Sequence, residues 1–486
     1  MNTKMLCALC AVGTAAAVES ATKTPPNVVI ILADDQGWAD LGIYGATNDV
    51  RTPNLDQLAR DGALFTSGYI TAPQCAPSRA GLITGKYQQR FGFDSIPDGP
   101  LPLEEITLAE RLQRAGYTTG FVGKWHLEPS GSCLRWGREH CPDRIQGNKV
   151  MVPVPLVRQY FPAGQGFDEY FRGEMSRFWI NYDLDGKPVE PQWRDIPEFR
   201  VDTQTQAALT FIDRNKSKPF FLYLGYFAPH VPLEATKQYL DRFPGNMPER
   251  RRYALAMISA MDDGVGAIRQ KLQESGLSEN TLIFYLSDNG APLGAQQDLY
   301  MADVLPVNKP KVVWDGSVNT PWLGEKGMLM EGGIRVPYIV TWPGTIPSGT
   351  VVDEPVISLD VAATVVSAAG LETPDELDGI NLLPRLSGKE KLLPKRSLFW
   401  RFWNQSAVRS GSWKYICLTD GREQLYDLST DAQEKVNRIA QHPEKAQALR
   451  AEIEEWAAQL QPAGLRRGNV TGEEMKWYEY YLNRAD

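Results

Sequence analysis

Two pairs of polar side chains stand directly after apolar runs that are typical of buried strands. Asp34 and Asp35 follow one run, and Asp288 and Asn289 follow another. Adjacent carboxylates at a buried position repel each other, so a cation usually compensates them. Three carboxylates and an amide oxygen suit Ca²⁺ or Mg²⁺ better than Zn²⁺. Either pair alone is typical of a polar strand end that caps a helix, but two pairs in the same context predict a divalent metal site.

A third candidate is the segment Cys75-Ala-Pro-Ser-Arg79, which is typical of the start of a helix. Proline is tolerated in a first helical turn, and the free backbone N–H groups there attract anions. A cysteine at such a position is expected to have a lowered pKa, and Arg79 adds a positive charge one turn along. These residues predict an activated cysteine beside an anion site, with a structural thiol at a helix end as the alternative.

Short apolar runs predict the buried parallel strands that position these side chains. The runs occupy residues 28–33, 119–122, 220–225, 282–286 and 337–342. Helical patterns alternate with them at 54–62, 107–115 and 253–276, the second opened by a capping box of Thr107 and Glu110. The alternation predicts an α/β fold, a large and mostly parallel mixed sheet flanked by helices, with ligands beyond the carboxyl ends of the strands.

The sequence pattern changes twice along the chain. Residues 128–200 interrupt the alternation with many aromatic, Arg, Pro and Gly residues, and we interpret them as an insertion that shapes the rim of a pocket. Short alternating runs and a helical stretch after residue 373 predict a smaller C-terminal α+β subdomain with a short antiparallel sheet. We therefore expect a catalytic domain at 22–372 and a subdomain at 373–486.

Composition and the N-terminus limit where the protein acts. The 486 residues are 43% hydrophobic and carry a formal charge of −8, which is ordinary for a globular protein and argues against a general nucleic-acid binder. Residues 1–21 are typical of a secretory signal, since the apolar stretch is shorter than the ~20 residues that span a bilayer. We expect a soluble protein that is periplasmic or secreted. Export would allow Cys133 and Cys141 to form a disulfide, and two unpaired thiols are equally consistent.

Several segments together resemble one known family. Cys75-Ala-Pro-Ser-Arg79, followed by Leu82-Ile-Thr-Gly85, resembles the signature of the type I, formylglycine-dependent sulfatases, which are arylsulfatase-like members of the alkaline phosphatase superfamily. The resemblance covers roughly residues 26–430. Further segments that resemble the family are 123–127, 228–232 and 324–337, with weaker matches at 52–56 and 166–168.

The resemblance implies a mechanism and the residues that perform it. Cys75 would be oxidised by a maturation enzyme to Cα-formylglycine, whose hydrate attacks sulfur and later expels sulfate when His126 removes a proton. Lys124 and Lys326 would bind sulfate oxygens, and His230 would protonate the leaving oxygen. The implied catalytic residues are Cys75, Arg79, Lys124, His126, His230 and Lys326. The implied ligands of Ca²⁺ or Mg²⁺ are Asp34, Asp35, Cys75, Asp288 and Asn289.

The substrate expected by analogy with the family is a sulfated carbohydrate, either a polysaccharide or an oligosaccharide derived from it. Aromatic and arginine side chains can stack on sugars and bind their sulfate groups. For each such residue, packing in the protein core is the alternative interpretation. The candidates are Trp179, Tyr182, Trp400, Arg401 and Trp403.

Three other functions compete with this interpretation. The nearest is a phosphoester or phosphonate monoester hydrolase of the same superfamily, for which a second metal cluster would be expected. A catalytically inactive relative that binds sulfated glycans is expected to lack Cys75 or Lys124, and both are present. A hydrolase that uses the unmodified Cys75 thiol would be active without a maturation enzyme.

Overall fold

The computed structural model describes residues 24–294, 314–463 and 478–482. The predicted signal at 1–21 lies outside the described residues. Within the described ranges, no helix combines the length and the apolar character needed to cross a membrane.

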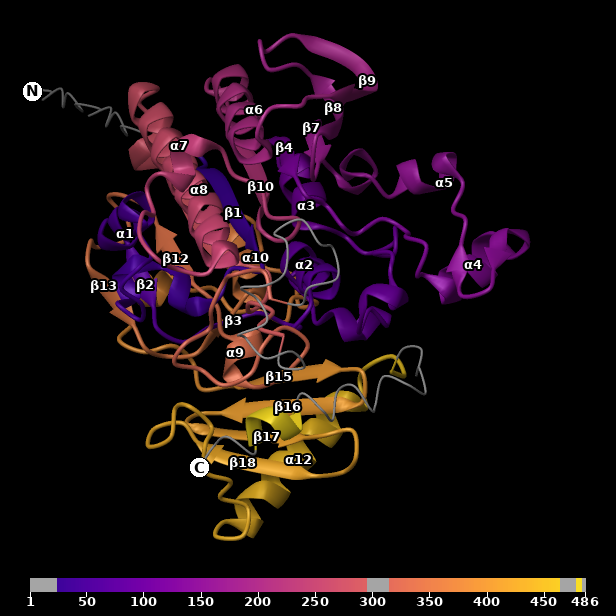
Figure 1. The fold of residues 1–486 in the computed structure, drawn as a ribbon, viewed down its shortest axis with the longest axis vertical. Helices are drawn as coiled ribbons and strands as arrows, with labels where there is room; N and C mark the ends of the chain where they lie inside the picture. The colour runs from indigo at the N-terminus through magenta and orange to yellow at the C-terminus, as the bar shows by residue number, and fades with distance from the viewer. Residues whose placement is uncertain (1–23, 295–313, 464–477, 483–486) are drawn as a thin grey trace, which may run out of the picture.

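A ten-stranded mixed sheet forms the centre of the molecule (Figure 1). Strands β11, β1, β10, β4 and β7 run parallel to one another in its middle. Strand β12 is antiparallel to both of its neighbours, and β8 and β9 form an antiparallel edge. The order of the strands is β13 (Thr350–Val352), β2 (Ala63–Phe65), β12 (Tyr338–Thr341), β11 (Thr281–Ser287), β1 (Asn27–Asp34), β10 (Phe220–Pro229), β4 (Thr118–Gly123), β7 (Glu169–Gly173), β8 (Arg177–Tyr182) and β9 (Pro188–Asp195).

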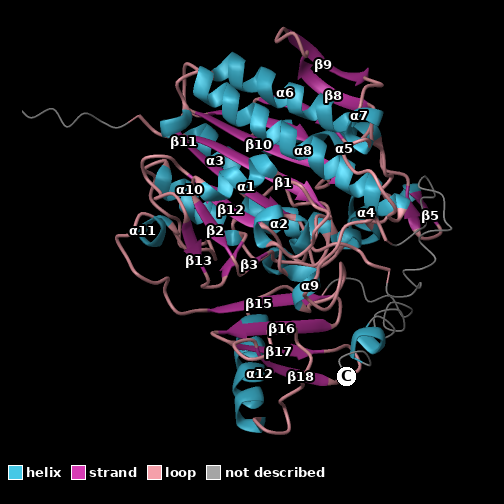
Figure 2. Ribbon diagram, turned by 60° about the vertical axis from the view of Figure 1, so that its left-hand side comes forward, coloured by secondary structure: helices cyan, strands magenta, loops and turns pink. Residues whose placement is uncertain are grey.

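Helices cover both faces of the sheet, because the central strands carry apolar side chains on both faces. In β1, Val29 and Ile31 face one hydrophobic core, and Val28 and Ile30 face the other. The first core is completed by α1 (Pro53–Arg60), α6 (Arg200–Asn215) and α8 (Glu249–Glu274). The second is completed by α2 (Cys75–Thr84), α3 (Leu108–Arg114) and α10 (Leu359–Ala368). Figure 2 shows the sheet between these helices.

The C-terminal part contains a separate four-stranded antiparallel sheet, at the bottom of Figure 1. Its strands are β15 (Ser397–Phe402), β16 (Gln405–Ser410), β17 (Trp413–Cys417) and β18 (Glu423–Asp427), and α12 (Pro443–Ala457) packs against β16 and β17. The other face of this sheet shares a hydrophobic core with Tyr69, Ile70 and residues 328–330. The predicted fold class is therefore confirmed, with one core that joins the two parts.

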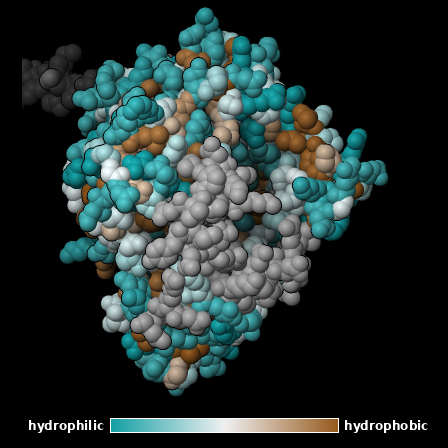
Figure 3. Space-filling view, in the orientation of Figure 1, coloured by the Kyte–Doolittle hydropathy of each residue, from teal (hydrophilic) through white to brown (hydrophobic). Residues whose placement is uncertain are grey.

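The remaining short strands and α-helices lie at the periphery or link the larger ones. They are β3 (Gly68–Tyr69), α4 (Leu134–His140), β5 (Ile145–Gln146), β6 (Lys149–Val150), α5 (Val154–Gln159), α7 (Lys237–Leu240), α9 (Glu331–Ile334), β14 (Val356–Ile357) and α11 (Leu383–Leu386). The face shown in Figure 3 is largely hydrophilic where the chain is described, with hydrophobic side chains gathered over α5. Met151 and Val154 are each 56% exposed.

Two expectations are corrected by the fold, and one of two open alternatives is favoured. The run at 337–342 forms β12, which is antiparallel rather than parallel, because an apolar run does not encode strand direction. Residues 128–200 are not only an insertion, since β7, β8 and β9 extend the main sheet. The thiols of Cys133 and Cys141 are both free, which favours the unpaired alternative.

Candidate active site

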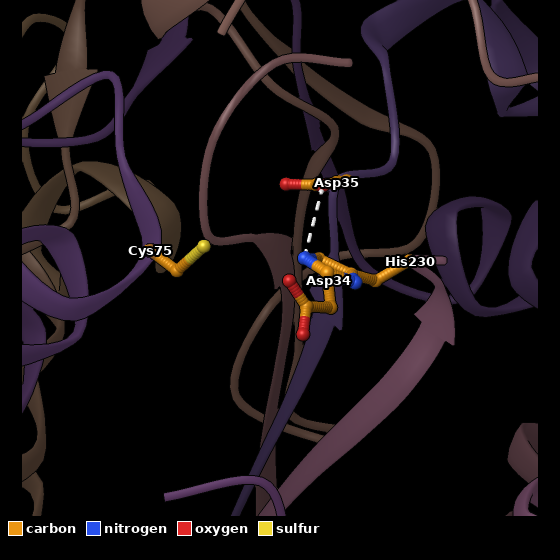
Figure 4. Close-up of side chains that lie close together, drawn as sticks. All are labelled: Asp34, Asp35, Cys75 and His230. Atoms are coloured by element: carbon orange, nitrogen blue, oxygen red, sulfur yellow. Dashed lines mark ion pairs between the residues drawn. The ribbon is translucent and has the colours of Figure 1, made fainter. Parts of the chain in front are cut away.

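Four side chains from three distant segments meet where the central strands end. One ligand atom from each of Asp34, Asp35, Cys75 and His230 lies within 4.8 Å of the others. Figure 4 shows the Cys75 Sγ atom pointing toward the two aspartates, with His230 on the far side of them. Asp34 ends β1, Cys75 begins α2, and His230 follows β10. The parallel strands thus bring together residues that are far apart in the sequence.

Each aspartate of the site has a cationic partner. The Lys124 Nζ atom lies 2.6 Å from the Asp34 Oδ2 atom, and both side chains are almost completely buried. The Lys326 Nζ atom donates to both Asp35 oxygens, at 2.6 and 2.8 Å. Burial raises the pKa of Asp34, but Lys124, His230 and Arg79 together hold it below its ordinary value. The site therefore concentrates positive charge around buried carboxylates.

Asp288 and Asn289 join the same cluster from the end of β11. The Asp35 backbone N–H donates to Asp288 Oδ1 at 3.1 Å, and Asn289 Nδ2 donates to Asp35 Oδ1 at 2.6 Å. Arg79 donates from Nε to Asp288 Oδ2 at 2.8 Å and from a terminal nitrogen to the Lys124 carbonyl at 2.7 Å. Burial, reinforced by the charge of Asp34, raises the pKa of Asp288 to about 6. Arg79 thus links the β11 side of the site to the β4 side.

The backbone around Lys124 and His126 is unusually constrained. Gly123 has φ +96°, and a Cβ atom there would lie 1.9 Å from the Gly225 carbonyl oxygen, so only glycine allows β4 to approach β10 this closely. His126 itself has φ +62°, which is uncommon for a residue with a side chain. Burial and the charges of Lys124 and Arg79 hold the pKa of His126 well below its ordinary value. A neutral imidazole in this place can accept a proton.

His230 is fixed by a buried arginine and a phenylalanine. Arg200, at the start of α6, donates to the carbonyl oxygens of His230 and Pro232 at 2.9 and 2.8 Å. The His230 ring stacks on Phe227, with centroids 4.8 Å apart. The Arg200 guanidinium and the Lys124 ammonium also lie over the Phe227 ring, at 4.8 and 5.0 Å. Arg200 and Phe227 were not predicted, because neither lies in a recognisable motif.

The donor atoms fit a divalent cation. Asp34 Oδ1 and Asn289 Oδ1 are buried and have no hydrogen-bond partner among the described residues. A buried acceptor without a partner is costly, and a hard cation with oxygen ligands would satisfy both atoms. Of the predicted ligands, Asp34, Asp35 and Cys75 belong to the cluster, and Asp288 and Asn289 are hydrogen-bonded to Asp35 beside it. His230 is the additional member of the cluster, which the sequence assigned only to catalysis.

The expected activation of the Cys75 thiol is not found. Burial raises the pKa of the Cys75 thiol to about 11, even though the charges of Lys124 and Lys326 act in the opposite direction. The side chain is only 2% exposed, and desolvation of a thiolate outweighs the effect of the helix start. The sequence-based prediction of a lowered thiol pKa was therefore wrong, because it ignored burial.

The residues predicted to contact a sugar are packed against protein. Tyr182 and Trp400 are fully buried, and Trp179 is 8% exposed. The Trp400 Nε1 atom donates to the Ile70 carbonyl at 2.6 Å, and Arg401 forms two hydrogen bonds with Asp94. Trp403 stacks on Phe402 at the turn between β15 and β16. For Tyr182 and Trp400 in particular, the geometry favours the core-packing alternative.

Comparison with known proteins gives a consistent result over most of the chain. The sulfatase family model matches residues 26–371, and a second model, N-sulphoglucosamine sulphohydrolase, C-terminal, matches residues 321–462. N-acetylgalactosamine-6-sulfatase from Rattus norvegicus is 35% identical over 423 residues, which cover 80% of this chain and 71% of the relative. Arylsulfatase A from Homo sapiens is 31% identical, and the match covers 91% of this chain and 90% of the relative.

A solved structure extends the similarity to the whole fold. The crystal structure of Ps i-CgsB in complex with k-i-k-neocarrahexaose has a TM-score of 0.73 and 27% sequence identity. The match covers 95% of this chain and 98% of that chain, so it includes both the large sheet and the C-terminal sheet.

Proposed function

The chain belongs to the sulfatase family of sulfuric ester hydrolases, and we propose that it removes sulfate from a sulfated carbohydrate. The observation that carries the proposal is the buried cluster around Cys75, in which Lys124, Lys326 and Arg79 gather beside the acidic side chains. A sulfate ester is an anion, and its cleavage requires positive charge fixed in place before the reaction begins. The relatives support the carbohydrate, because N-acetylgalactosamine-6-sulfatase is named for a sugar sulfate and Ps i-CgsB was crystallised with an oligosaccharide.

We propose that a maturation enzyme converts Cys75 to Cα-formylglycine. When formed, this group supplies an oxygen nucleophile and a second hydroxyl that lets sulfate leave. The high pKa of the unmodified thiol gives no support to the alternative of a hydrolase that uses Cys75 directly.

Asp34, Asp35, Asp288 and Asn289, together with position 75, would hold Ca²⁺ or Mg²⁺. When bound, the ion supplies positive charge beside the nucleophile. The remaining work falls to side chains of the chain itself. His126 accepts a proton at the nucleophile, and Arg79 orients the segment that carries it.

The sulfate group and the leaving oxygen have separate partners in this proposal. Lys124 and Lys326 bind sulfate oxygens, so each ammonium group exchanges part of its interaction with Asp34 or Asp35 for the substrate. His230 donates a proton to the leaving oxygen, which is the sugar hydroxyl after cleavage. The contacts of Arg200 and Phe227 with His230 support this role, since a general acid must be held in one orientation.

The proposal includes export, for which the composition of residues 1–21 is the support. An exported enzyme would meet extracellular polysaccharides or their fragments. The maturation enzyme and the carbohydrate are the partners that we propose.

The decisive experiment measures free sulfate released by matured protein from a panel of sulfated mono-, oligo- and polysaccharides. Cys75→Ala is the control, and mass spectrometry of the peptide that contains residue 75 establishes conversion. We expect release from one class of carbohydrate and none with Cys75→Ala. Phosphate and phosphonate esters are tested in parallel. Fully converted protein that cleaves only those esters would exclude the proposal in favour of the phosphoester alternative.

A further inference from the structure

The hairpin formed by β15 and β16 belongs to the C-terminal sheet, yet it reaches the backbone on both sides of the active site. A two-residue turn at Trp403 and Asn404 joins the strands, and Gln405 is the first residue of β16. The side chain of Gln405 is completely buried. A buried amide must find partners for both its donor and its acceptor, so the contacts of Gln405 are informative.

The side-chain amide of Gln405 pairs with the backbone immediately after Lys326. Its Nε2 atom donates to the Gly327 carbonyl at 3.0 Å, and its Oε1 atom accepts from the Leu329 N–H at 3.2 Å. The amide therefore binds a carbonyl and an N–H two residues apart, as a neighbouring strand would. The Tyr478 hydroxyl supports the arrangement, since it accepts from the same Leu329 N–H at 3.0 Å and donates to Gln405.

This backbone needs to be held, because its conformation is unfavourable for most residues. Gly327 has φ +94°, in the left-handed region that favours glycine. Two more hydrogen bonds fix the other side of the segment: the Lys326 N–H donates to the Ala291 carbonyl, and the Gly327 N–H to the Pro73 carbonyl at 2.8 Å. Pro73 lies two residues before Cys75, so the same segment touches the nucleophile side of the site.

The hairpin also binds the segments that flank Cys75. Trp400 donates to the Ile70 carbonyl at 2.6 Å, and Gln89 donates to the Arg401 carbonyl at 2.8 Å. Ile70 precedes Cys75, and Gln89 follows the helix that Cys75 begins. One hairpin thus contacts the chain before Cys75, the chain after it and the chain after Lys326.

We propose that Gln405 is a positioning residue for Lys326, a role that rests on the proposed function of Lys326 in binding sulfate oxygens. Gln405 fixes the backbone at Gly327 and Leu329, and the fixed backbone sets where the Lys326 ammonium lies relative to Asp35 and position 75. The C-terminal sheet in this way contributes to the sulfate-binding side of an active site whose proposed catalytic residues all precede that sheet in the chain.

The first test is structural and does not depend on any substrate. Gln405→Met keeps the length of the side chain and removes its donor and acceptor. We expect a crystal structure of this variant to show the segment at 327–329 displaced and at least one hydrogen bond from Lys326 to Asp35 lost. Ser406→Ala is the matched control, because the next residue of β16 points to the opposite face. An unchanged Lys326 position in Gln405→Met would overturn the proposal.

The second test is a double-mutant cycle with Lys326→Met, measured as kcat/KM for sulfate release by fully matured proteins. A small misplacement of a charged group lowers turnover steeply, so we expect Gln405→Met alone to lose roughly tenfold or more. In the Lys326→Met background the same change should cost less than about threefold, because the group that it positions is already absent. Equal losses in both backgrounds would mean that Gln405 is merely structural.

A further variant and a further readout keep the outcome decisive. If Gln405→Met unfolds below the assay temperature, Gln405→Glu replaces it, since it retains an acceptor for Leu329 and loses the donor to Gly327. Calorimetric titration with inorganic sulfate separates this proposal from the proposed function. Wild-type protein that binds sulfate but releases none from carbohydrates would contradict the proposed substrate. Weaker sulfate binding by the Gln405 variant would still support the positioning role.

Discussion

Buried ion pairs determine how the residues of the active site behave before substrate arrives. Lys124 and Asp34 are 3% and 0% exposed, so removal of either takes away the closest opposite charge of a buried group. The same lysine is proposed to bind sulfate. In this proposal Lys124 has two roles, and a substitution is expected to affect both folding and turnover.

Lys124→Met is expected to lower kcat/KM at least about 100-fold, because one of the fixed positive charges is lost. It should also lower the unfolding temperature, since Asp34 loses its closest cation. Lys237→Met is the control, because the Lys237 side chain is 85% exposed and pairs with Asp241 on the surface. Kinetics together with thermal unfolding check both effects. Full activity in Lys124→Met would exclude the proposed sulfate contact.

Arg200→Lys tests how His230 is held. A lysine cannot reproduce the paired hydrogen bonds of the guanidinium to the His230 and Pro232 carbonyls. We expect kcat to fall about 10- to 100-fold, with a smaller change in KM. Arg214→Lys, at the other end of α6, changes the same residue type away from the site and should leave kcat unchanged. Equal kinetics for the two variants would contradict a role for Arg200.

Sequence could predict only part of this network. Cys75, Lys124, His126, His230 and Lys326 were found because each lies in a segment that resembles a family signature, and their catalytic roles stay a proposal. Arg200 and Gln405 carry no such signal, because an arginine at a helix start and a glutamine after a turn are typical of exposed positions. Their contacts are made to backbone atoms of distant segments, which no local pattern encodes.

At the scale of secondary structure, apolar runs located the central strands well. The runs at 28–33 and 282–286 became β1 and β11 with only small changes at their ends. No apolar run marks β16, whose residues are largely polar, and the pattern did not predict the direction of β12. Both features depend on what the strand packs against, and composition alone does not determine that.

A buried cluster of charges joins α9 to the C-terminal sheet. The Lys414 Nζ atom, on β17, lies 2.9 Å from the Glu331 Oε1 atom and 2.8 Å from the Glu434 Oε1 atom. All three side chains are buried. Burial raises the pKa of Glu434 to about 7, although Lys414 acts in the opposite direction. Burial also raises the pKa of Glu331, but Lys414 and Arg335 hold it at about 2. Glu434 is thus the member of the cluster that titrates near neutral pH.

Glu434 should make stability depend on pH. The pKa of Glu434 in the folded protein lies above its ordinary value of 4.5. Its contribution to the free energy of unfolding is therefore fully present below about pH 4.5 and is lost as the pH rises through about 7. Between about pH 5 and pH 8, we expect the free energy of unfolding of Glu434→Gln to decrease by roughly 1–3 kcal/mol less than that of the wild type. Denaturant unfolding across this range measures it, with the exposed Glu444→Gln as control. An unchanged slope in Glu434→Gln would contradict the assignment.

At the scale of the whole molecule, we propose a catalytic domain at 22–372 and a C-terminal subdomain at 373–486, but the two are not independent units. Their shared core contains Tyr69, Ile70 and Met328 from the first and Trp400 and Tyr426 from the second. The family model for the C-terminal region also begins at residue 321, well before the proposed boundary. The proposed boundary therefore marks a change in the sequence pattern, but residues on both sides of it pack in one hydrophobic core.

A chain that ends at residue 372 is expected to be insoluble or only partly folded. It would expose the apolar side chains at 69–70 and 328–330 and lose the contacts of Gln405 with the Lys326 segment. Size-exclusion chromatography and far-ultraviolet circular dichroism of the truncated protein test this. A monomeric truncated protein with an unfolding transition like that of the full chain would show that the first part folds alone.

The order of the strands has a consequence for the timing of synthesis. Position 75 is closed in by segments that the ribosome makes much later, since β10 begins at Phe220 and the Lys326 segment lies farther still. An enzyme that must handle the Cys75 side chain finds it 2% exposed in the finished fold. Such an enzyme would reach Cys75 more easily while the nascent chain is still incomplete. The topology therefore implies that the proposed conversion of Cys75 takes place before the segments that enclose it have been synthesised.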